Sequence, residues 1–453
     1  MKLENDLGKD NIKQLVMRIA LPSMLAQFVS VFYSIVDRMY IGNIPKVGAV
    51  ALAGVGICGP VVTMIGSVAF LVGVGGAPLM SMKLGAGDKK AAENILSNAF
   101  LMLLAFSIII TAIIYPIREP MLRLFGASEV IWPYAEKYFS IYLTGTVFAL
   151  LTTGMNQFII SQGFSKVGMK SVVIGAVLNI ILDPVFIFAL DMGVAGAAIA
   201  TVLSQLASCI FVLRFLFGDK ATVRIGFGGY HWKIMLKILT IGITPFLIIA
   251  ADNIMIIAMN AILQKYGGVA QGDMLVTCAT IAQSFMLVVT MPLGGITGGT
   301  QTILAFNYGA GRPDRIRQAE KYILILCVVY TSVMFLFAQT AGPLFVRLFT
   351  GDPVIAKGAF RAIRICTLAI IPLAVQYMIV DGFTGLGKVQ YSLPLSVFRK
   401  LVYFISLFLL PALFGAAATF YAEPISDIIS PVVSGIIYWI SMKKILQYDK
   451  KNK

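Results

Sequence analysis

The sequence predicts an all-α polytopic membrane protein, with twelve transmembrane helices in two six-helix lobes. Of its 453 residues, 58% are hydrophobic and 13% charged, and the mean hydropathy is +0.88, which is too apolar for a soluble protein of this length. Apolar runs of about 18 residues or more recur along the chain, and each can cross about 30 Å of hydrocarbon as a helix. The second half of the chain also repeats features of the first. These observations exclude a soluble enzyme.

The twelve spans follow one another with short connections. We place them at approximately 14–42, 50–80, 91–115, 132–161, 168–190, 193–217, 234–263, 274–306, 317–341, 360–384, 392–414 and 422–446. The polar, basic segment 1–18 and the length of the first span argue against a cleavable signal peptide.

The internal repeat defines the two lobes. Matching segments recur in the same order at nearly one offset, which favours a duplicated unit. The matches pair Pro22 with Pro245, Gly85-Ala86-Gly87 with Gly309-Ala310-Gly311, Arg123-Leu124-Phe125 with Arg347-Leu348-Phe349, and Gly163 with Gly385. We therefore predict an N-terminal lobe at 1–218, a cytoplasmic linker at 219–231 and a C-terminal lobe at 232–453. Because each lobe has an even number of spans, their axis runs along the membrane normal, as in one class of secondary transporters.

Charge predicts the orientation. Basic residues gather in alternate loops on the side of the N-terminus, for example at Lys83, Lys89 and Lys90, at Lys166 and Lys170, and at Arg312, Arg315 and Arg317. By the positive-inside rule, both termini are cytoplasmic. The net charge of +15 is explained by this basic face next to anionic lipid, so no nucleic-acid partner is expected.

The most informative polar residues lie inside apolar runs. Asp183 interrupts the fifth span, and a carboxylate at this depth is a functional hypothesis by default. Asn179 lies one turn earlier on the same helix face, where an amide and an acid can share a small cation. Asp37 and Thr201 are expected at a similar depth in the outer half of the membrane, and Tyr33 stands one turn before Asp37, where it can donate to the carboxylate.

Simpler roles for the two acids stay open. Asp37 can cap its helix near the outer interface, and Asp183 can end a short helix because a residue before proline disfavours helical geometry. Six further apolar residues after Pro184 argue against a helix end there.

Cysteine and histidine indicate no metal site. The five cysteines all fall in apolar runs without paired spacing, so we interpret them as small hydrophobic residues. They are Cys58, Cys209, Cys278, Cys327 and Cys366. The single histidine, His231, lies in a basic loop. No cofactor and no metal are expected, other than a small cation at the pair of Asn179 and Asp183.

Several motifs resemble the multidrug and toxic compound extrusion (MATE) transporters, in the bacterial branch that includes the staphylococcal multidrug pumps. The resemblance covers essentially the whole chain. Its most specific parts are Val36-Asp37-Arg38-x-x-x-Gly42, Gly85-Ala86-Gly87-Asp88, the run from Asn179 to Pro184, the run from Gly193 to Thr201, the region of Arg399, and Pro424-Ile425-Ser426-Asp427.

The resemblance implies a two-lobe exporter of the prokaryotic plasma membrane that exchanges H⁺ or Na⁺ for organic, often cationic, drugs. Family members with a characterised first-lobe cation site have ligands at the positions of Asp37, Asn179, Asp183 and Thr201. Pro22 corresponds to a proline that bends the first helix. Membrane lipid and small organic cations are the expected partners, and a monomer is expected.

The second lobe carries its own acids. Some branches place a cation site in the seventh and tenth spans, where this chain has Asp252 and Asp381. Glu423 and Asp427 add acidity at the depth of Thr201. Arg399 lies on the same side as Asp381, and both a buried ion pair and a substrate contact stay open for it.

The predicted mechanism is antiport by population shift. Neutralising Asp37 and Asp183 lets the first helix bend at Pro22 and expel the drug, and emptying the site restores the drug-binding shape. Two alternatives stay open: a flippase for lipid-linked oligosaccharides of the related superfamily, and a channel or receptor. Acidic intramembrane residues favour a cationic substrate over the flippase, and the twofold repeat without a soluble domain disfavours a channel or receptor.

Overall fold

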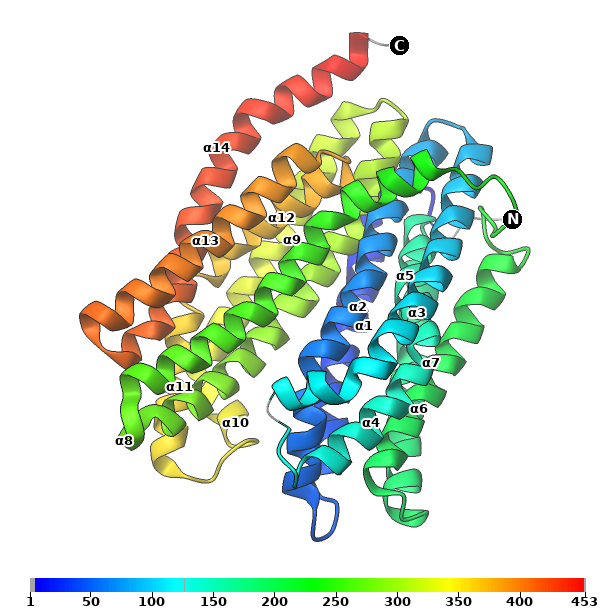
Figure 1. Ribbon diagram of the computed structural model, residues 1–453. Coiled ribbons are helices and arrows are strands. Elements are labelled where there is room, and N and C mark those ends of the chain that lie inside the picture. The colour runs from blue at the N-terminus through cyan, green and yellow to red at the C-terminus, as the bar shows by residue number, and fades with distance from the viewer. Residues whose placement is uncertain (1–4, 126, 452–453) are drawn as a thin grey trace. The chain divides into compact units, whose positions relative to one another are not determined.

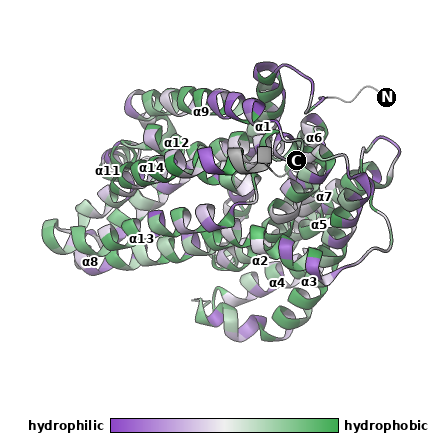
Figure 2. Cartoon of the chain, turned by 90° about the horizontal axis from the view of Figure 1, so that it is seen from above, coloured by the Kyte–Doolittle hydropathy of each residue, from purple (hydrophilic) through white to green (hydrophobic). Residues whose placement is uncertain are grey.

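A computed structural model of the protein describes residues 5–125 and 127–451, and within them it contains helices and no β-strand (Figure 1). The first four residues of the predicted N-terminal lobe, 1–4, and the last two of the predicted C-terminal lobe, 452–453, lie outside the described residues. In the described part of the chain, ten helical segments, two of them within the long helix Trp232–Gly309, are long and apolar enough to cross a membrane, and two bent helix pairs bring the number to the twelve predicted spans. Figure 2 shows hydrophobic residues along most of the length of the helices, as expected for helices that cross a membrane.

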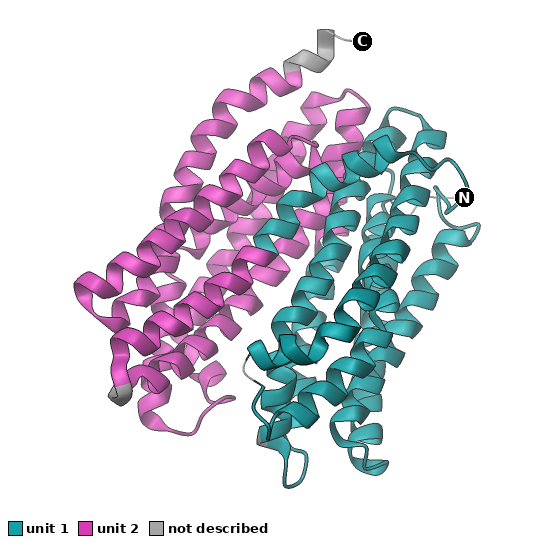
Figure 3. Ribbon diagram, viewed as in Figure 1, with its two compact units in different colours: residues 1–7, 21–249 teal, residues 8–20, 250–453 magenta. Residues whose placement is uncertain are grey.

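The chain forms two compact units (Figure 3). Unit 1 comprises residues 5–7 and Leu21–Ile249. Its helices are most of α1 (Ile12–Gly42), α2 (Gly48–Gly85), α3 (Lys89–Leu124), α4 (Trp132–Thr144), α5 (Thr146–Ser161), α6 (Ser165–Pro184), the π-helix η1 (Val185–Ala189), α7 (Gly193–Phe217) and the beginning of α8 (Trp232–Gly309). Within it, α2 packs on α3 and α5, and α6 packs on α7.

Unit 2 comprises Gly8–Ala20 and residues 250–451. Its helices are the beginning of α1, the rest of α8, α9 (Pro313–Thr340), α10 (Gly342–Val346), α11 (Pro353–Cys366), α12 (Ile370–Gly385), α13 (Val389–Phe414), the 3₁₀-helix η2 (Ala416–Tyr421) and α14 (Ala422–Lys451). Within it, α12 packs on α9 and α14, and α13 packs on α14. The lobe and linker boundaries inferred from the repeat stay a prediction.

The fourth and tenth spans are bent, which the sequence analysis did not anticipate. Helices α4 and α5 meet at Gly145 with an angle of 56°, and α11 and α12 meet with an angle of 50°. A Cβ on Gly145 would lie 2.6 Å from Val202 of α7, so the bend brings the backbone against that helix. In the tenth span, Pro372 cannot donate to the carbonyl four residues earlier, and the helix restarts just before it. The bends fall in equivalent spans of the two repeats.

Two further features concern helix continuity. Helix α8 combines the predicted spans 234–263 and 274–306 and is broken at Gly268, whose φ of 59° and ψ of −168° are not helical. The helical span does not end at Pro184, because η1 continues it to Ala189. Proline lacks the N–H for the regular helical bond, and a π-turn accommodates the loss. Asp183 therefore lies within a continuing helical span.

The turns between helices repeat as the sequence predicts, with one correction. Gly87 and Gly311 both adopt left-handed φ, +82° and +66°, which glycine adopts without a Cβ penalty. The equivalent of Gly163 (φ +91°) is Gly387 (φ +67°). The sequence repeat pairs Gly163 with Gly385 instead, which ends the helix Ile370–Gly385 and lacks the left-handed φ of the turn.

Glycines let α2 and the first part of α8 approach closely inside unit 1. A Cβ on Gly242 would overlap the carbonyl of Leu71, and a Cβ on Gly75 would overlap the carbonyl of Ile238. Gly73 approaches Gly154 of α5, with its would-be Cβ 2.9 Å from that carbonyl oxygen. The glycine-rich stretch of α2 is therefore explained by close helix packing.

Candidate functional site

Three of the candidate residues meet where α6 packs on α7. The Asn179 Nδ2 donates to Asp183 Oδ1 at 3.2 Å and to Thr201 Oγ1 at 3.5 Å. The Thr201 hydroxyl in turn donates to the Ala197 carbonyl at 3.0 Å. Asp183 is fully buried and Asn179 is almost so. The spacing of four residues between Asn179 and Asp183 places both on the helix face that α7 covers.

Helix α7 can approach this face because Gly196 has no side chain. A Cβ there would lie 2.6 Å from the backbone of Phe186 in η1. The glycine thus brings Thr201, which follows slightly more than one turn later, next to the amide of Asn179.

Asp37 of α1 joins the group. Its carboxyl lies within hydrogen-bonding reach of the Asp183 carboxyl. Two carboxylates at this distance repel each other unless a proton or a cation lies between them. The two acids that the sequence placed at one depth are therefore neighbours in one site.

Three oxygen atoms of the site lack a hydrogen-bond partner. They are Asp37 Oδ1, Asn179 Oδ1 and Asp183 Oδ2, and all three are buried. A buried acceptor without a donor is unfavourable. Carboxylate, amide and hydroxyl oxygens are hard ligands that suit Na⁺, and the same carboxyl groups can hold a proton instead. The donor set of these residues therefore fits either coupling ion.

Two tyrosines, Tyr33 and Tyr138, lie near Asp37. Tyr33 lies close enough for the charge of Asp37 to act on it, but among the described hydrogen bonds none joins the two residues. The charge of Asp37 also acts on Tyr138 of α4. The ring of Tyr138 stacks on that of Tyr142, with centroids 6.4 Å apart. The sequence analysis missed both α4 tyrosines because they resembled ordinary buried aromatics; the signal was two tyrosines spaced by one turn.

Pro22 lies inside α1, fifteen residues before Asp37. The helix is continuous through it from Ile12 to Gly42. The border between the two compact units crosses α1 between Ala20 and Leu21. The proline therefore stands at the point where α1 passes from one packing environment to the other.

In unit 2, Arg399 is held by two acids of α14. Its Nε donates to Asp427 Oδ1 at 2.8 Å, and its Nη2 lies 3.3 Å from Glu423 Oε1. Asp427 is fully buried, and its Oδ2 has no partner. Arg399 thus makes a buried ion pair with α14 and none with Asp381 among the described ion pairs.

The two other acids proposed for the second lobe, Asp252 and Asp381, contact different residues. Asp381 Oδ2 accepts a 2.5 Å hydrogen bond from the Thr297 hydroxyl of α8, whereas Asp252 pairs with Lys400 of α13. The structure does not join Asp252 and Asp381 directly. Sequence reasoning missed Lys400, although a second cation directly after Arg399 in an apolar span indicates a carboxylate partner.

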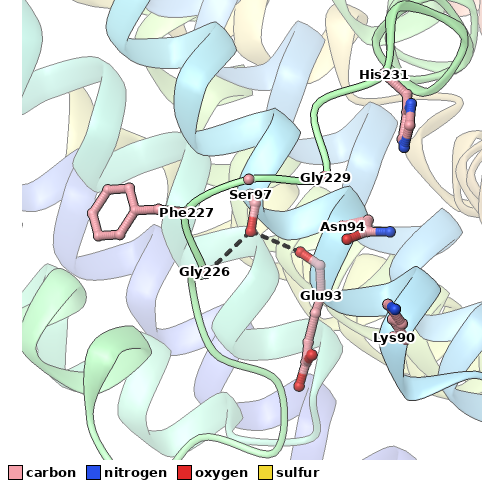
Figure 4. Close-up of a pocket in the computed structure, with 9 residues that line it drawn as sticks. Lys90, Glu93, Asn94, Ser97, Gly226, Phe227, Gly229 and His231 are labelled. Atoms are coloured by element: carbon pink, nitrogen blue, oxygen red, sulfur yellow. Dashed lines mark hydrogen bonds between the residues drawn. The ribbon is translucent and has the colours of Figure 1, made fainter.

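A pocket of about 490 Å³ lies elsewhere in unit 1, beneath the segment between α7 and α8 (Figure 4). The Ser97 hydroxyl accepts from the Gly226 N–H at 3.1 Å. Asn98 donates to the Gly229 carbonyl and accepts from the His231 N–H, both at 3.0 Å. These bonds from α3 fix the linker on unit 1, and the pocket shares no residue with the Asp183 site.

Comparison with known proteins identifies relatives over the whole chain. The family model MatE matches residues 22–185 and 249–410. The chain is 24% identical to the multidrug export protein MepA of Staphylococcus haemolyticus (strain JCSC1435), covering 98% of this chain and 96% of that protein. It is 23% identical to MepA of Staphylococcus aureus (strain MRSA252), covering 95% and 94%.

Solved structures have a similar fold. One, described as the outward-facing conformation of a multidrug resistance MATE family transporter of the MOP superfamily, has a TM-score of 0.90 at 23% identity, covering 97% of this chain and 98% of that chain. Another, described as MATE in complex with MaD3S, has a TM-score of 0.90 at 24% identity with the same coverage.

Proposed function

The chain belongs to the MatE family of membrane transporters, and from this membership we propose that it is a cation-coupled multidrug efflux antiporter. It exchanges H⁺ or Na⁺ for amphipathic, often cationic, organic compounds by alternating access. The proposal draws on the multidrug export proteins among its relatives. It acts as a monomer in the bacterial plasma membrane, with both termini in the cytoplasm.

The observation that carries the proposal is the contact between Asp37 and Asp183. Two acids within hydrogen-bonding reach, with buried oxygens that lack donors, form a site whose energy depends strongly on whether a proton or small cation is present. Asn179 and Thr201 supply the further oxygens that a bare cation needs. Thr201 forms the wall of the site that α7 contributes.

Coupling follows from this dependence on charge. When the site is neutralised, Asp37 no longer repels Asp183, and α1 can change its packing near Pro22. When the site is empty, the negative charge favours the drug-binding conformation. The ion shifts the equilibrium only if it binds the two conformations with different affinity.

The second-lobe charges support a cationic cargo. Unit 2 contains three acids, Asp252, Glu423 and Asp427, paired with the two cations Lys400 and Arg399. If all five groups are ionised, one negative charge is in excess, which an organic cation compensates. A flippase for anionic lipid-linked sugars needs the opposite excess.

Ethidium efflux from proteoliposomes tests the proposal, with a pH gradient and a Na⁺ gradient imposed separately. Asp37→Asn and Asp183→Asn should each abolish gradient-driven efflux while the protein still reconstitutes. Asp219→Asn, in the exposed linker ion pair with Arg224, serves as the matched control and should transport normally. Wild-type efflux by both site variants would move coupling to the second-lobe acids.

A further inference from the structure

Glu320 is a buried acid that the proposed mechanism does not use. It lies seven residues after Pro313, at the beginning of α9, and only 4% of it is exposed. At 1.5 Å per residue, it lies about 10 Å inside the helix. This end of α9 carries Arg312, Arg315, Arg317 and Lys321 and is predicted to face the cytoplasm.

The carboxyl group has one hydrogen-bonded oxygen and one without a partner. Glu320 Oε2 accepts from the Tyr438 hydroxyl of α14 at 2.6 Å. Glu320 Oε1 is buried with no partner. A neutral phenol is thus the donor that holds this acid, and an ionised carboxylate normally needs several donors or a paired cation when it is buried.

The surroundings on the other helices are mostly apolar. On α12, Gly382 is the neighbour, since a Cβ there would lie 3.9 Å from Glu320 Oε1 and 3.8 Å from Leu304 of α8. The preceding acid of α12, Asp381, is engaged with Thr297. The ring of Phe383 packs on Tyr438 at 6.0 Å.

One cation acts on Glu320 from its own helix. Arg317, one turn earlier and exposed, exerts its field on both Glu320 and Tyr438. Arg315 is instead engaged with the Asn307 side chain and the Asp10 carbonyl. Among the described ion pairs none includes Glu320, so the Tyr438 hydroxyl holds this acid and Arg317 is the cation whose field reaches it.

We propose that Glu320 is a second proton-exchange site, located in unit 2 and served from the side of the membrane where α9 begins. An O–H bond forms at Oε1 with a proton taken from water on that side, and its loss returns the proton there. Tyr438 is a positioning residue, because its hydroxyl can donate to Oε2 in both states. The proposal rests on ion-coupled antiport, but it is independent of Asp37 and Asp183.

The test measures protons released or taken up when ethidium binds to the purified full-length protein in detergent, followed with a pH-indicator dye across a range of pH. Glu320→Gln keeps the shape and removes the titration, so it should exchange one proton fewer per ethidium bound than the wild type. Asp183→Asn should lose its own, separate contribution, and the double variant both.

The outcomes separate the two proposals. An unchanged proton count and pH profile in Glu320→Gln would overturn the role of Glu320 and leave the first-lobe site untouched. An unchanged count in Asp183→Asn would instead exclude proton exchange at the first-lobe site and leave Glu320 untouched, whereas ethidium efflux that responds to neither a pH gradient nor a Na⁺ gradient would contradict the proposed function. If Glu320→Gln does not fold, Tyr438→Phe takes its place, because it keeps the acid and removes the donor. A displaced pH midpoint of proton exchange supports the proposal, and an unmoved midpoint contradicts it.

Discussion

The ion pairs of Arg399 show how residue-scale energetics depends on burial. Two carboxylates of α14 surround its guanidinium, and neither Arg399 nor Asp427 is well exposed, with side chains 13% and 0% accessible. A buried pair of this kind contributes little net stability relative to an apolar replacement, but removal of one partner leaves an uncompensated charge. The interaction therefore specifies how α13 and α14 align.

We expect Arg399→Met to destabilise the protein by about 3–5 kcal/mol, because it leaves Glu423 and Asp427 without their cation. Thermal unfolding in detergent measures the loss. The double variant Arg399→Met with Asp427→Asn should recover part of it, since the second change removes the unpaired charge.

Arg224→Met is the matched control for this prediction. Its ion pair with Asp219 is exposed, at 51% and 92%, so its loss should hardly change the unfolding temperature. Equal unfolding temperatures for the Arg399 and Arg224 variants would contradict the assignment of a buried pair.

The first-lobe site could largely be anticipated at this scale, whereas the second could not. A spacing of four residues and a shared depth indicated Asn179, Asp183 and Asp37, and the structure places them together, whereas their role in coupling stays a prediction. The partners of Arg399, Lys400 and Glu320 depend on which face of each helix meets its neighbour, and that is decided by packing. Glu320 also lies among the basic residues at the beginning of α9, so in the sequence it resembled one more exposed charge at a helix end.

At the scale of helices, close contacts depend on glycine. Gly242 of α8 lies so close to α2 that a Cβ would overlap the Leu71 carbonyl. Backbone atoms of two packed helices cannot yield as a flexible side chain can. The two helices would have to separate to admit a methyl group.

Gly242→Ala should therefore lower the unfolding temperature and the yield of folded protein. Gly66→Ala on α2 is the control, because a Cβ at this position meets nothing within 4 Å and alanine favours the helix by up to about 1 kcal/mol. Size-exclusion chromatography after heating compares the two. If Gly242→Ala is as stable as Gly66→Ala, the backbone contact is not required.

The segment between α7 and α8 behaves as a docked element. Asn98 makes two hydrogen bonds to its backbone, and these contribute about 2 kcal/mol in total. Asn98→Ala should consequently increase trypsin cleavage after Lys220 or Arg224 about thirtyfold, as local opening becomes easier. Ser97→Ala removes one bond and should have a smaller effect. Equal cleavage in all three proteins would mean that the linker is held by other contacts.

Helix existence was predictable, and helix breaks were less so. All twelve spans have the apolar length that a membrane requires. The bends at Gly145 and before Pro372 depend on local packing as well as on residue type, because glycine and proline also occur within unbroken helices of this chain, such as Pro22 in α1. A single residue therefore does not decide where a span bends.

For the molecule as a whole, the orientation can be tested with single cysteines. Lys220 and Lys357 are both exposed lysines, predicted on opposite sides of the membrane. The five native cysteines are buried, so they should react slowly with a membrane-impermeant maleimide. In whole cells Lys357→Cys should be labelled and Lys220→Cys protected, and inverted vesicles should show the opposite. Reversed labelling would place both termini outside.

The sequence repeat and the packing divide the whole chain by different criteria. The repeat predicts a single boundary, in the linker 219–231, because it matches segments that follow one another in the same order in each half of the chain. Packing separates it elsewhere: Gly8–Ala20 belongs with unit 2, and the first part of α8, up to Ile249, belongs with unit 1. Nothing in the periodicity of the sequence shows this exchange of helix beginnings.

The exchange has a consequence for biosynthesis. A ribosome that has just completed α7 has not yet supplied Ile238 and Gly242, against which Gly75 and Leu71 pack. Domains otherwise tend to fold in order of synthesis, the N-terminal one first. In this protein the N-terminal bundle cannot finish folding in the translocon until the chain has entered its second half.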